Sequence, residues 1–522
     1  MPRKRYPFSP AAPQATAGFA GKVLILGWSR RLFPILDELA LARPKGRRTK
    51  VVILSEVEVE HGREQIKLHT KPNGRLKIKT FVGNPARIET LETLKLSTFS
   101  SVIVLYPENP LHAGVVHTVL ALQESSLAPG VKIVAEATNS EFVEDLMRTS
   151  SGRVIPVRSD QVAAKVIAQS SRQPGLSEVF LDLLDFAGDE IYFTPMPALA
   201  GKTYGDALLS FNTASVIGLS HENGVVDLNP SPSAEILKHT RVISIAQDDT
   251  KIHFTGIREE LVSETPPPKK LDAQPERIAI LGWSETGRLI VEDLIESLPD
   301  GSSIQVFAQS NSVSLESLQA LDSAPRIQLN YETSENPVGA LEKNLEKQKI
   351  NEILILAYRD GLTRVDADAL TVRNLAQLKK VLSASPHNSE RPRLVAELLD
   401  RSHQAEAQAA GDPDLLVNDD LASYLIAQLS QDPSLSLVFD ELFGAKGPSL
   451  EIRDIGNYAT VGKETSFAQL VANARARGES AIGYRVGDEN TTGQSVKVNP
   501  DKDTMFTPKA TDGLVVVADT VR

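Results

Sequence analysis

The chain has 522 residues, which is too long for one hydrophobic core and predicts several domains. Its 67 acidic and 56 basic residues give a net charge of -11, which argues against nucleic-acid binding and against a generally cationic membrane-binding surface. It has no cysteine, which excludes disulfides, thiolate metal sites and a cysteine nucleophile, and favours a reducing, cytoplasmic setting.

The beginning of the chain reads as a flexible leader. Residues 1–20 start with basic residues and continue with proline and alanine, without the continuous apolar core of a signal peptide. No run of about 18 or more apolar residues follows anywhere, so the sequence predicts no segment that spans a bilayer. The chain as given is expected to be soluble.

The rest of the chain is an internal duplication. Ile-Leu-Gly-Trp-Ser occurs at 25–29 and again at 280–284, and both tryptophans of the protein lie in these copies. Further matching stretches follow in the same order, at 101–106 and 352–357, 132–136 and 393–397, 166–170 and 425–429, 201–203 and 462–464, 217–218 and 482–483, and 227–230 and 497–500. Two units of about 250 residues therefore share one plan, as repeats do when each copy is one structural unit.

Within each unit, short β-branched runs alternate with helical patterns. In the first unit the runs are at 22–26, 50–54, 78–82, 101–105 and 131–135. Nearly continuous apolar strands predict a parallel, doubly wound Rossmann-type sheet, followed by a helical crossover with an apolar face and by a small α+β lobe. The predicted divisions are a leader (1–20), Rossmann domains (21–158 and 276–417), crossover helices (159–187 and 418–447), lobes (188–262 and 448–522) and a proline-rich linker (263–275).

The first strand-to-helix turn of such a sheet lies where ligands bind. In the first unit this turn contains Gly27, Trp28, Ser29, Arg30 and Arg31, without the second and third glycines of the dinucleotide fingerprint. Two cations at a helix N-terminus are unfavourable unless an anion or a carboxylate compensates them. The turn therefore predicts an anion site, with exposed or acid-paired arginines as the alternative.

An acid belongs after the second strand, where it would contact a ribose. Glu56 stands there in the first unit, although it could also be an ordinary strand-end acid. The second unit keeps Gly282, Ser284 and Gly287, but Gln309 replaces the acid and Glu285 occupies the helix start. A carboxylate at that position would cap the helix and repel phosphate, so the second turn is a weaker candidate.

Other signals predict no chemistry. Gly201-Lys202-Thr203 lacks the earlier glycine of a phosphate loop and reads as a turn that starts a helix. The pairs Asp248-Asp249 and Asp419-Asp420 could bind Ca²⁺ through oxygen ligands, but such pairs are usually solvated, and no metal ligands are predicted. No catalytic constellation is recognisable, so the sequence predicts no enzyme.

Four stretches of the sequence carry a family likeness: Gly27-Trp28-Ser29, the run Gln-Ser-Ser-Arg-Gln-Pro-Gly-Leu at 169–176, Ile-Gly-Tyr-Arg at 482–485, and Asn499-Pro500. They resemble the cytosolic part of the CASTOR/POLLUX ion channels. The likeness runs from about residue 21 to 520. More distantly, each unit is similar to an RCK module, the regulator of K⁺ conductance, which is also found in TrkA-type transport regulators. The family carries membrane helices ahead of the first module, which this chain lacks.

The resemblance implies two RCK modules per chain and a ring of four chains beneath a cation pore, with K⁺ as the expected ion. The pore subunit would be part of the same polypeptide or a separate partner. The chain would then be a ligand-sensing regulatory ring whose ligand, NAD, NADH or an adenine nucleotide, binds the first unit. In this hypothesis Glu136 lines the cleft, although it could instead cap the next helix. The alternatives are an NAD(P)-dependent oxidoreductase and a ligand-free structural scaffold.

Overall fold

The computed structural model describes residues 21–519, apart from short segments at 43–47, 72–73, 106–112, 129, 138–139, 151, 259, 262–273, 310–320, 322–325, 359–361, 385–390, 412, 444–446 and 488–494. The predicted leader and nearly all of the predicted proline-rich linker lie outside the described residues.

Six parallel strands form the first sheet, in the order β3-β2-β1-β4-β5-β6. They are β1 (Lys22–Leu26), β2 (Thr49–Ser55), β3 (Leu76–Val82), β4 (Ser101–Val104), β5 (Ile133–Ala137) and β6 (Val154–Arg158), with helices α1 (Leu32–Leu41), α2 (Val59–His69), α3 (Ile88–Glu92), η1 (Leu96–Thr98), α4 (Ala113–Gln123) and α5 (Ser140–Thr149) between them. The predicted strands are all present, and β6 is an addition to them. This order places the switch point between β1 and β4.

The central strands of this sheet are buried on both faces. Leu24, Leu26 and Val52 pack into one core with apolar side chains of α3, α4 and α5. Their neighbours Val23 and Ile25 point to the opposite face, because side chains alternate along a strand, and they are 1% and 0% exposed. Burial on both faces explains why these strands read as continuous apolar runs.

The second half of the chain repeats the sheet. The order β13-β12-β11-β14-β15-β16 is the same, and all pairings are parallel. The elements are β11 (Arg277–Leu281), α9 (Glu285–Ser297), β12 (Ser303–Ala308), β13 (Gln328–Thr333), α11 (Pro337–Leu345), β14 (Glu352–Ile355), α12 (Arg364–Ala384), β15 (Arg393–Leu398), η4 (Arg401–His403), α13 (Gln404–Gly411) and β16 (Asp414–Val417). The predicted fold class is confirmed.

Each half ends in a lobe built on a four-stranded antiparallel sheet, β7-β10-β8-β9 or β17-β22-β19-β20. The first lobe contains β7 (Glu190–Pro195), η2 (Pro197–Leu199), α8 (Tyr204–Leu208), β8 (Ser215–Ser220), β9 (Val226–Leu228), β10 (Arg241–Ala246) and η3 (Asp249–Lys251). The second contains β17 (Pro448–Asp454), η5 (Ile455–Asn457), β18 (Thr465–Ser466), α16 (Phe467–Arg475), β19 (Ser480–Val486), β20 (Ser495–Val498), β21 (Met505–Phe506) and β22 (Gly513–Asp519).

The two lobes repeat even unusual backbone geometry. Asn229 and Asn499 both have a positive φ, 46° and 43°, a conformation that asparagine tolerates better than most residues. The Asn229 amide donates to the Ile217 carbonyl at 2.9 Å, and the Asn499 amide donates to the Ile482 carbonyl at 2.7 Å. The matching Asn-Pro pairs in the sequence therefore mark one shared turn.

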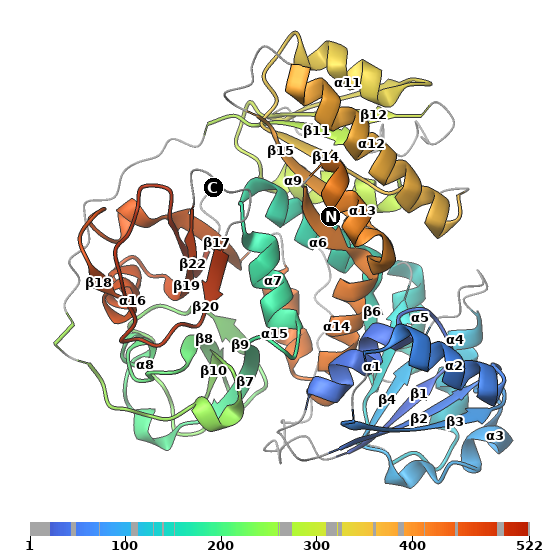
Figure 1. The fold of residues 1–522 in the computed structure, drawn as a ribbon. Helices are drawn as coiled ribbons and strands as arrows, with labels where there is room; N and C mark the ends of the chain where they lie inside the picture. The colour runs from blue at the N-terminus through green and yellow to red at the C-terminus, as the bar shows by residue number, and fades with distance from the viewer. Residues whose placement is uncertain are drawn as a thin grey trace. The chain divides into compact units, whose positions relative to one another are not determined.

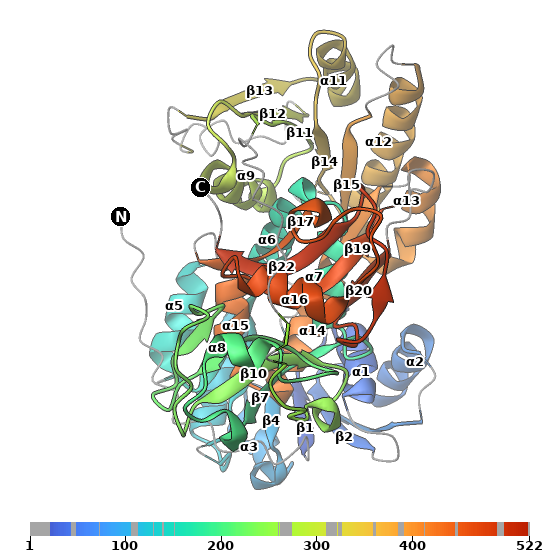
Figure 2. The same ribbon diagram turned by 90° about the vertical axis from the view of Figure 1, so that its left-hand side faces the viewer.

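The crossover helices α6 (Ser159–Arg172) with α7 (Leu176–Leu184), and α14 (Asn418–Gln431) with α15 (Leu435–Leu442), join a sheet to its lobe. The chain forms two compact units, and each contains segments from both repeats. Unit 1 consists of residues 1–159, 182–257 and 422–440, and unit 2 of residues 160–181, 258–421 and 441–522. Most of α6 thus belongs to the unit of the second sheet, and most of α14 to the unit of the first. Figures 1 and 2 show α14 beside α1, and α6 beside α9.

One buried cation lies in the second lobe. Lys502 is 1% exposed, and its ammonium nitrogen lies 4.8 Å from the centre of the Phe467 ring. Burial, reinforced by the charge of Arg258, lowers the pKa of Lys502 to about 7. Above that pH the unfolded chain binds the proton more strongly than the folded chain, so stability rises with pH until the unfolded lysine also titrates, near its ordinary pKa of 10.5.

Replacing this lysine tests the burial cost. We expect Lys502→Met to raise the free energy of unfolding by about 2 kcal/mol at pH 6, where the wild-type lysine is charged in both states. The difference in the free energy of unfolding between the variant and the wild type should shrink as the pH rises towards 10. Urea denaturation across this range measures it, with the exposed Lys509→Met as control. A difference independent of pH would contradict the assignment.

Candidate functional site

A cleft of about 410 Å³ opens at the carboxyl ends of the first sheet. It lies over the switch point between β1 and β4, the position at which open α/β sheets bind ligands. Its lining comes from the ends of β1, β2 and β4, the turn after β3 and the first turns of α4: Leu26, Gly27, Trp28, Ser55, Glu56, Val57, Asn84, Pro85, Ala86, Val104, Leu105, Gly114, Val115, His117 and Thr118. Three of the predicted residues, Gly27, Trp28 and Glu56, are among them.

Gly27 sets the path of the turn. Its φ is +93°, which side chains disfavour, and a Cβ there would lie 2.7 Å from the Leu105 carbonyl oxygen. The chain can therefore pass close over the end of β4 only with glycine at this position. Trp28 follows, half-buried, with its ring edge-on to Phe33 at 6.0 Å. A Cβ on Gly62 of α2 would lie 3.3 Å from the indole, so that glycine lets Trp28 lie against the helix.

The two arginines of the turn have different environments. Arg30 is exposed, whereas Arg31 directly precedes α1 and forms an ion pair with Glu136 at the end of β5. The Glu136 side chain is 1% exposed and that of Arg31 is 14% exposed. A carboxylate thus compensates the charge of Arg31. Neither Arg31 nor Glu136 lines the cleft, and both hold the turn against the sheet.

Ser29 is 4% exposed, and its hydroxyl has no hydrogen-bond partner. Ser284 at the same position of the second repeat is 1% exposed, and its hydroxyl is also unpartnered. Buried hydroxyls normally find partners, so the turns of both repeats keep an unused polar group at the switch point.

The lining of the first cleft suits a nucleoside better than a phosphate. Glu56 is exposed directly after β2, where it could accept hydrogen bonds from a ribose, and the apolar walls could hold a base. The cleft volume falls within the roughly 300–1,000 Å³ of small-molecule pockets. The lining residues include no lysine or arginine, so the phosphates of a nucleotide would have to reach the turn at Ser29 and Arg30.

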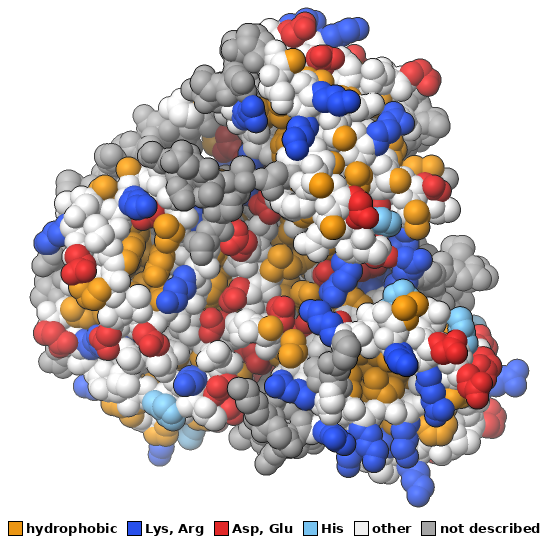
Figure 3. All heavy atoms as spheres, in the orientation of Figure 1, with side chains coloured by type: hydrophobic (Ala, Val, Ile, Leu, Met, Phe, Trp, Pro, Cys, Tyr) orange, Lys and Arg blue, Asp and Glu red, His pale blue; other side chains and the backbone are white. Residues whose placement is uncertain are grey.

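Positively charged side chains instead lie at the amino ends of the strands of the first sheet. Lys22 and Lys50 are register partners at the amino ends of β1 and β2. Burial and the charges of Lys79, Lys50 and Lys95 lower the pKa of Lys22. Figure 3 shows lysine and arginine side chains gathered along the lower edge of this domain. Lys22 and Lys50 lie at the amino ends of their strands, which is the wrong end to attract an anion into the cleft.

The second repeat fills the corresponding space with aromatic side chains. Gly282 has a φ of +101°, and a Cβ there would lie 2.6 Å from the Leu356 carbonyl oxygen and 3.1 Å from the Tyr358 ring. Trp283 is 3% exposed and packs where a Cβ on Gly287 would meet its ring at 3.2 Å. Gln309 follows β12, at the predicted place after the second strand. The two equivalent tryptophans therefore have different roles, because Trp28 in the first repeat lines a cleft and Trp283 in the second repeat belongs to the core.

The helix start of the second turn is compensated within its own helix. Glu285 accepts from the Arg288 guanidinium, with Nε at 2.8 Å, in the first turn of α9. This contact is an ion pair between side chains and not a cap, since the N-cap residue Ser284 makes no side-chain cap hydrogen bond, and the self-capping of this turn stays a prediction. The buried Glu397, which corresponds to Glu136, accepts from the Ala357 amide and from the Asn418 side chain.

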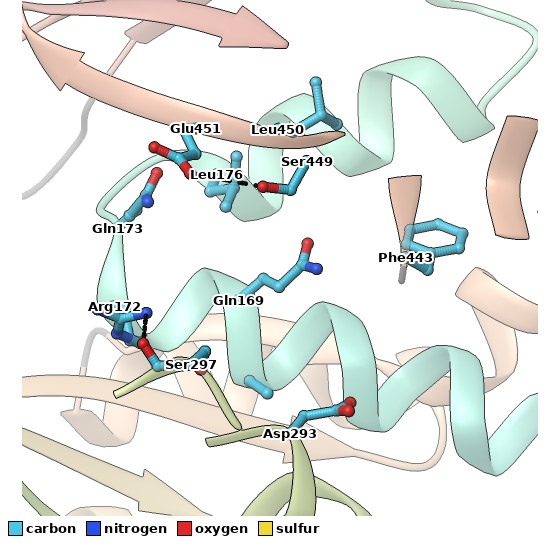
Figure 4. A pocket seen from close by; sticks show the side chains of 11 residues that line it. Gln169, Arg172, Gln173, Leu176, Asp293, Ser297, Phe443, Ser449, Leu450 and Glu451 are labelled. Atoms are coloured by element: carbon cyan, nitrogen blue, oxygen red, sulfur yellow. Dashed lines mark hydrogen bonds between the residues drawn. The ribbon is translucent and has the colours of Figure 1, made fainter. Parts of the chain in front are cut away.

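A second functional element is the bend between α6 and α7, which we call the crossover clasp and define as residues 169–176. Arg172 donates to the Glu276 carboxylate at 2.9 Å. It also donates to the Ser297 carbonyl at 3.2 Å, a contact that Figure 4 shows. Gln173 accepts from the Ile452 amide at 2.5 Å. The clasp therefore fastens to the sheet and the lobe of unit 2.

The clasp also joins motifs that are far apart in the sequence. The Arg485 guanidinium donates to the Pro174 carbonyl at 3.0 Å and to the Thr511 carbonyl at 2.8 Å. Gly175 has a φ of +85°, and a Cβ there would lie 2.9 Å from Val496. The Gln-Pro-Gly-Leu run and the Ile-Gly-Tyr-Arg run thus meet in one structural element, which sequence spacing alone could not show.

The remaining acidic and glycine signals have structural explanations. Asp419 pairs with Arg364, Asp420 pairs with Arg401 at 2.7 Å, and Asp248 accepts from the Thr250 amide. Thr203 caps α8 in a capping box with Asp206, so Gly201-Lys202-Thr203 is a turn that starts a helix, as predicted. Among the described residues, no three acidic or histidine side chains converge to hold a metal ion.

Each half of the chain has a Rossmann-type sheet, crossover helices and an antiparallel lobe, so the chain is a tandem of two units of one fold. The match to the structure of the human SLO3 gating ring covers 96% of this chain and 100% of the SLO3 chain, with a TM-score of 0.67 and 13% sequence identity. At this identity the likeness shows the fold alone.

The sequence comparisons are more specific. A family model described as "Castor and Pollux, part of voltage-gated ion channel" matches residues 160–260. The probable ion channel POLLUX of Oryza sativa subsp. japonica is 26% identical over 95% of this chain and 54% of its own length. The ion channel CASTOR of Lotus japonicus is 26% identical over 89% of this chain and 59% of its own length. The predicted resemblance to the CASTOR/POLLUX channels is confirmed, and the chain spans little more than half of these relatives. No helix in the described ranges is both long enough and apolar enough to cross a membrane.

The Arg31–Glu136 pair gives a test of the turn. We expect Arg31→Ala to lower the free energy of unfolding by about 3 kcal/mol, because Glu136 would stay buried without its cation. Arg30→Ala removes the same charge from an exposed position and should change stability by less than about 0.5 kcal/mol. Urea denaturation of both variants measures the difference. Equal losses would show that the ion pair does not stabilise the turn.

Proposed function

We propose that this chain is the ligand-sensing regulatory module of a cation channel, with K⁺ as the ion. It acts as a gating ring and performs no chemistry. The observation that carries the proposal is the near full-length similarity to CASTOR/POLLUX ion channels, joined to the fold of a gating ring. The open cleft in the first repeat supplies a place for the ligand.

The ligand proposed for this cleft is NAD, NADH or an adenine nucleotide. Gly27 allows the close turn, Trp28 and the apolar walls receive the base, and Glu56 accepts from the ribose hydroxyls. The Ser29 hydroxyl and Arg30 are the groups nearest in sequence that can meet phosphate. The second repeat, with Tyr358 and Trp283 in its cleft, serves as structure and binds no ligand.

The proposed mechanism is a shift between two arrangements of the modules. A ligand that binds the cleft more tightly in one arrangement favours that arrangement by its difference in affinity. The bends near 174 and 433 are the hinges in this proposal, because each lies within a crossover along which the chain passes from one unit to the other, inside α7 and inside α15. Four chains would form the ring on the cytoplasmic side of the membrane, attached to a pore in the same polypeptide or in a partner.

Solution mass and ligand stabilisation together test this function. A chain of 56.7 kDa that forms a ring should sediment as four chains or a multiple of four. A ligand at about one hundred times its dissociation constant should raise the free energy of unfolding by about 2.7 kcal/mol, since only the folded cleft binds it. A monomer that responds to none of NAD, NADH, ATP, ADP and AMP would contradict the proposal, and steady turnover of NADH would favour an enzyme.

A variant can block the cleft without disturbing the fold. Gly114 lies in the first turn of α4 and lines the cleft, and a Cβ there would contact nothing within 4 Å. We expect Gly114→Phe to abolish the thermal shift caused by the nucleotide that stabilises the wild type, while stability without ligand changes by less than about 1 kcal/mol.

The matched control for this variant is Gly74→Phe. Gly74 is exposed in a turn, and a Cβ there also meets nothing within 4 Å. This variant should keep the full ligand response. If Gly114→Phe keeps the response as well, the ligand binds outside the cleft.

A further inference from the structure

Unit 1 contains a second cavity, of about 420 Å³, at the amino ends of the strands of the first sheet, whereas the first cleft lies at their carboxyl ends. Three segments of the chain line it. The amino-terminal edge of the sheet contributes Gly21, Ser100 and Ser101, the first lobe contributes Phe186, residues 190–195 and Asp249, and the second crossover contributes Gln428, residues 430–432 and Leu435. All of these residues belong to unit 1. Nothing in the proposed nucleotide response uses this cavity.

The charged residues that line the cavity are all acidic. They are Glu190 at the start of β7, Asp249 in η3 and Asp432 after α14. Burial raises the pKa of Glu190 to about 8, and the charges of Asp249, Asp248 and Asp189 add to the shift, while a hydrogen bond with Tyr192 opposes it. Asp432 accepts from the Ser434 amide at 2.9 Å, and Arg241 partly offsets its charge. The cavity thus gathers three acidic side chains, of which Asp249 is exposed and Glu190 is kept mostly neutral at pH 7 by burial.

Two buried acceptors in this cavity have no partner. Gln428 is 1% exposed, and its amide nitrogen donates to the Leu183 and Leu184 carbonyls at 2.9 Å and 2.8 Å. This contact fixes the amide, but its oxygen has no hydrogen-bond partner. The Ser101 hydroxyl, 5% exposed, is also unpartnered. An unsatisfied buried acceptor is unfavourable, so a ligand that donates hydrogen bonds here would recover that desolvation cost.

We propose that this cavity binds a small organic cation with ammonium groups, of the polyamine class. An ammonium group supplies positive charge for the carboxylates and N–H donors for Gln428 and Ser101. The described residues hold no cluster of three acidic or histidine ligands suited to a metal ion, which favours an organic cation. The volume lies within the roughly 300–1,000 Å³ of small-molecule pockets.

Calorimetric titration with spermidine and with putrescine tests the proposal on the intact chain. We expect binding by at least one of these amines, and no binding of tetramethylammonium, which carries the charge without N–H donors. Glu190→Gln together with Asp249→Asn keeps the shapes of both side chains and removes the two carboxyl groups that would be ionised in the complex. This variant should weaken amine binding about tenfold or more. Asp227→Asn, an exposed change in the same lobe, should leave binding unchanged.

Proton release separates this site from non-specific attraction. Glu190 is mostly protonated at pH 7, and a bound cation favours its charged form, so binding should release up to one proton per ligand. Titrations in buffers of different ionisation enthalpy measure the release, and Glu190→Gln should abolish it. Equal binding of tetramethylammonium, or an unchanged affinity in the double variant, would overturn the proposal. Gly114→Phe should leave amine binding intact, so this result and the nucleotide result can fail separately.

Discussion

The structure depends on burying the crossover helices. Ala163, Val166 and Ile167 of α6 are each 2% exposed or less, as are Leu421 and Ile426 of α14. Helices with so much apolar surface cannot remain in water, and their burial provides the main driving force for docking them. Most of α6 belongs to the unit of the second sheet and most of α14 to that of the first, so neither unit completes its core from one repeat alone. The apolar face predicted from the sequence finds its partner within the same chain.

This constraint explains why the crossover clasp is so densely hydrogen-bonded. A bend between two buried helices must satisfy its own backbone groups and fix the direction of the second helix, along which the chain passes from unit 2 to unit 1. Arg485 donates to the Pro174 carbonyl of the bend, the Gln173 side chain accepts from the Ile452 amide of β17, and Arg172 anchors the end of α6. Gly175 supplies the left-handed backbone conformation that the sharp turn needs. The run of residues that most resembles the family is therefore the one that controls how the two repeats connect.

The sequence predicted the architecture well because its signals are local. Continuous apolar runs, repeated glycine turns and matching Asn-Pro pairs each depend on a few neighbouring residues. The additional strands β6 and β16 were not predicted, since each is short and lies close to the helix that follows. The candidate site was predicted less completely. Gly27, Trp28 and Glu56 line the cleft, but the pairing of Arg31 with Glu136 depends on two residues 105 positions apart, which no local pattern encodes.

The repeats diverged in their side chains while their backbone stayed alike. Both turns need glycine over a carbonyl of the fourth strand, yet one leaves an open cleft and the other places Tyr358 in that space. The same unit that keeps the open cleft also carries the acidic cavity, at the other end of the same strands. Ligands at both ends of one sheet would be linked whenever each prefers the same arrangement of the module, and that coupling must act equally in both directions. In the proposed function, the division of the duplicated chain into one sensing repeat and one structural repeat follows from which cavities its side chains leave open.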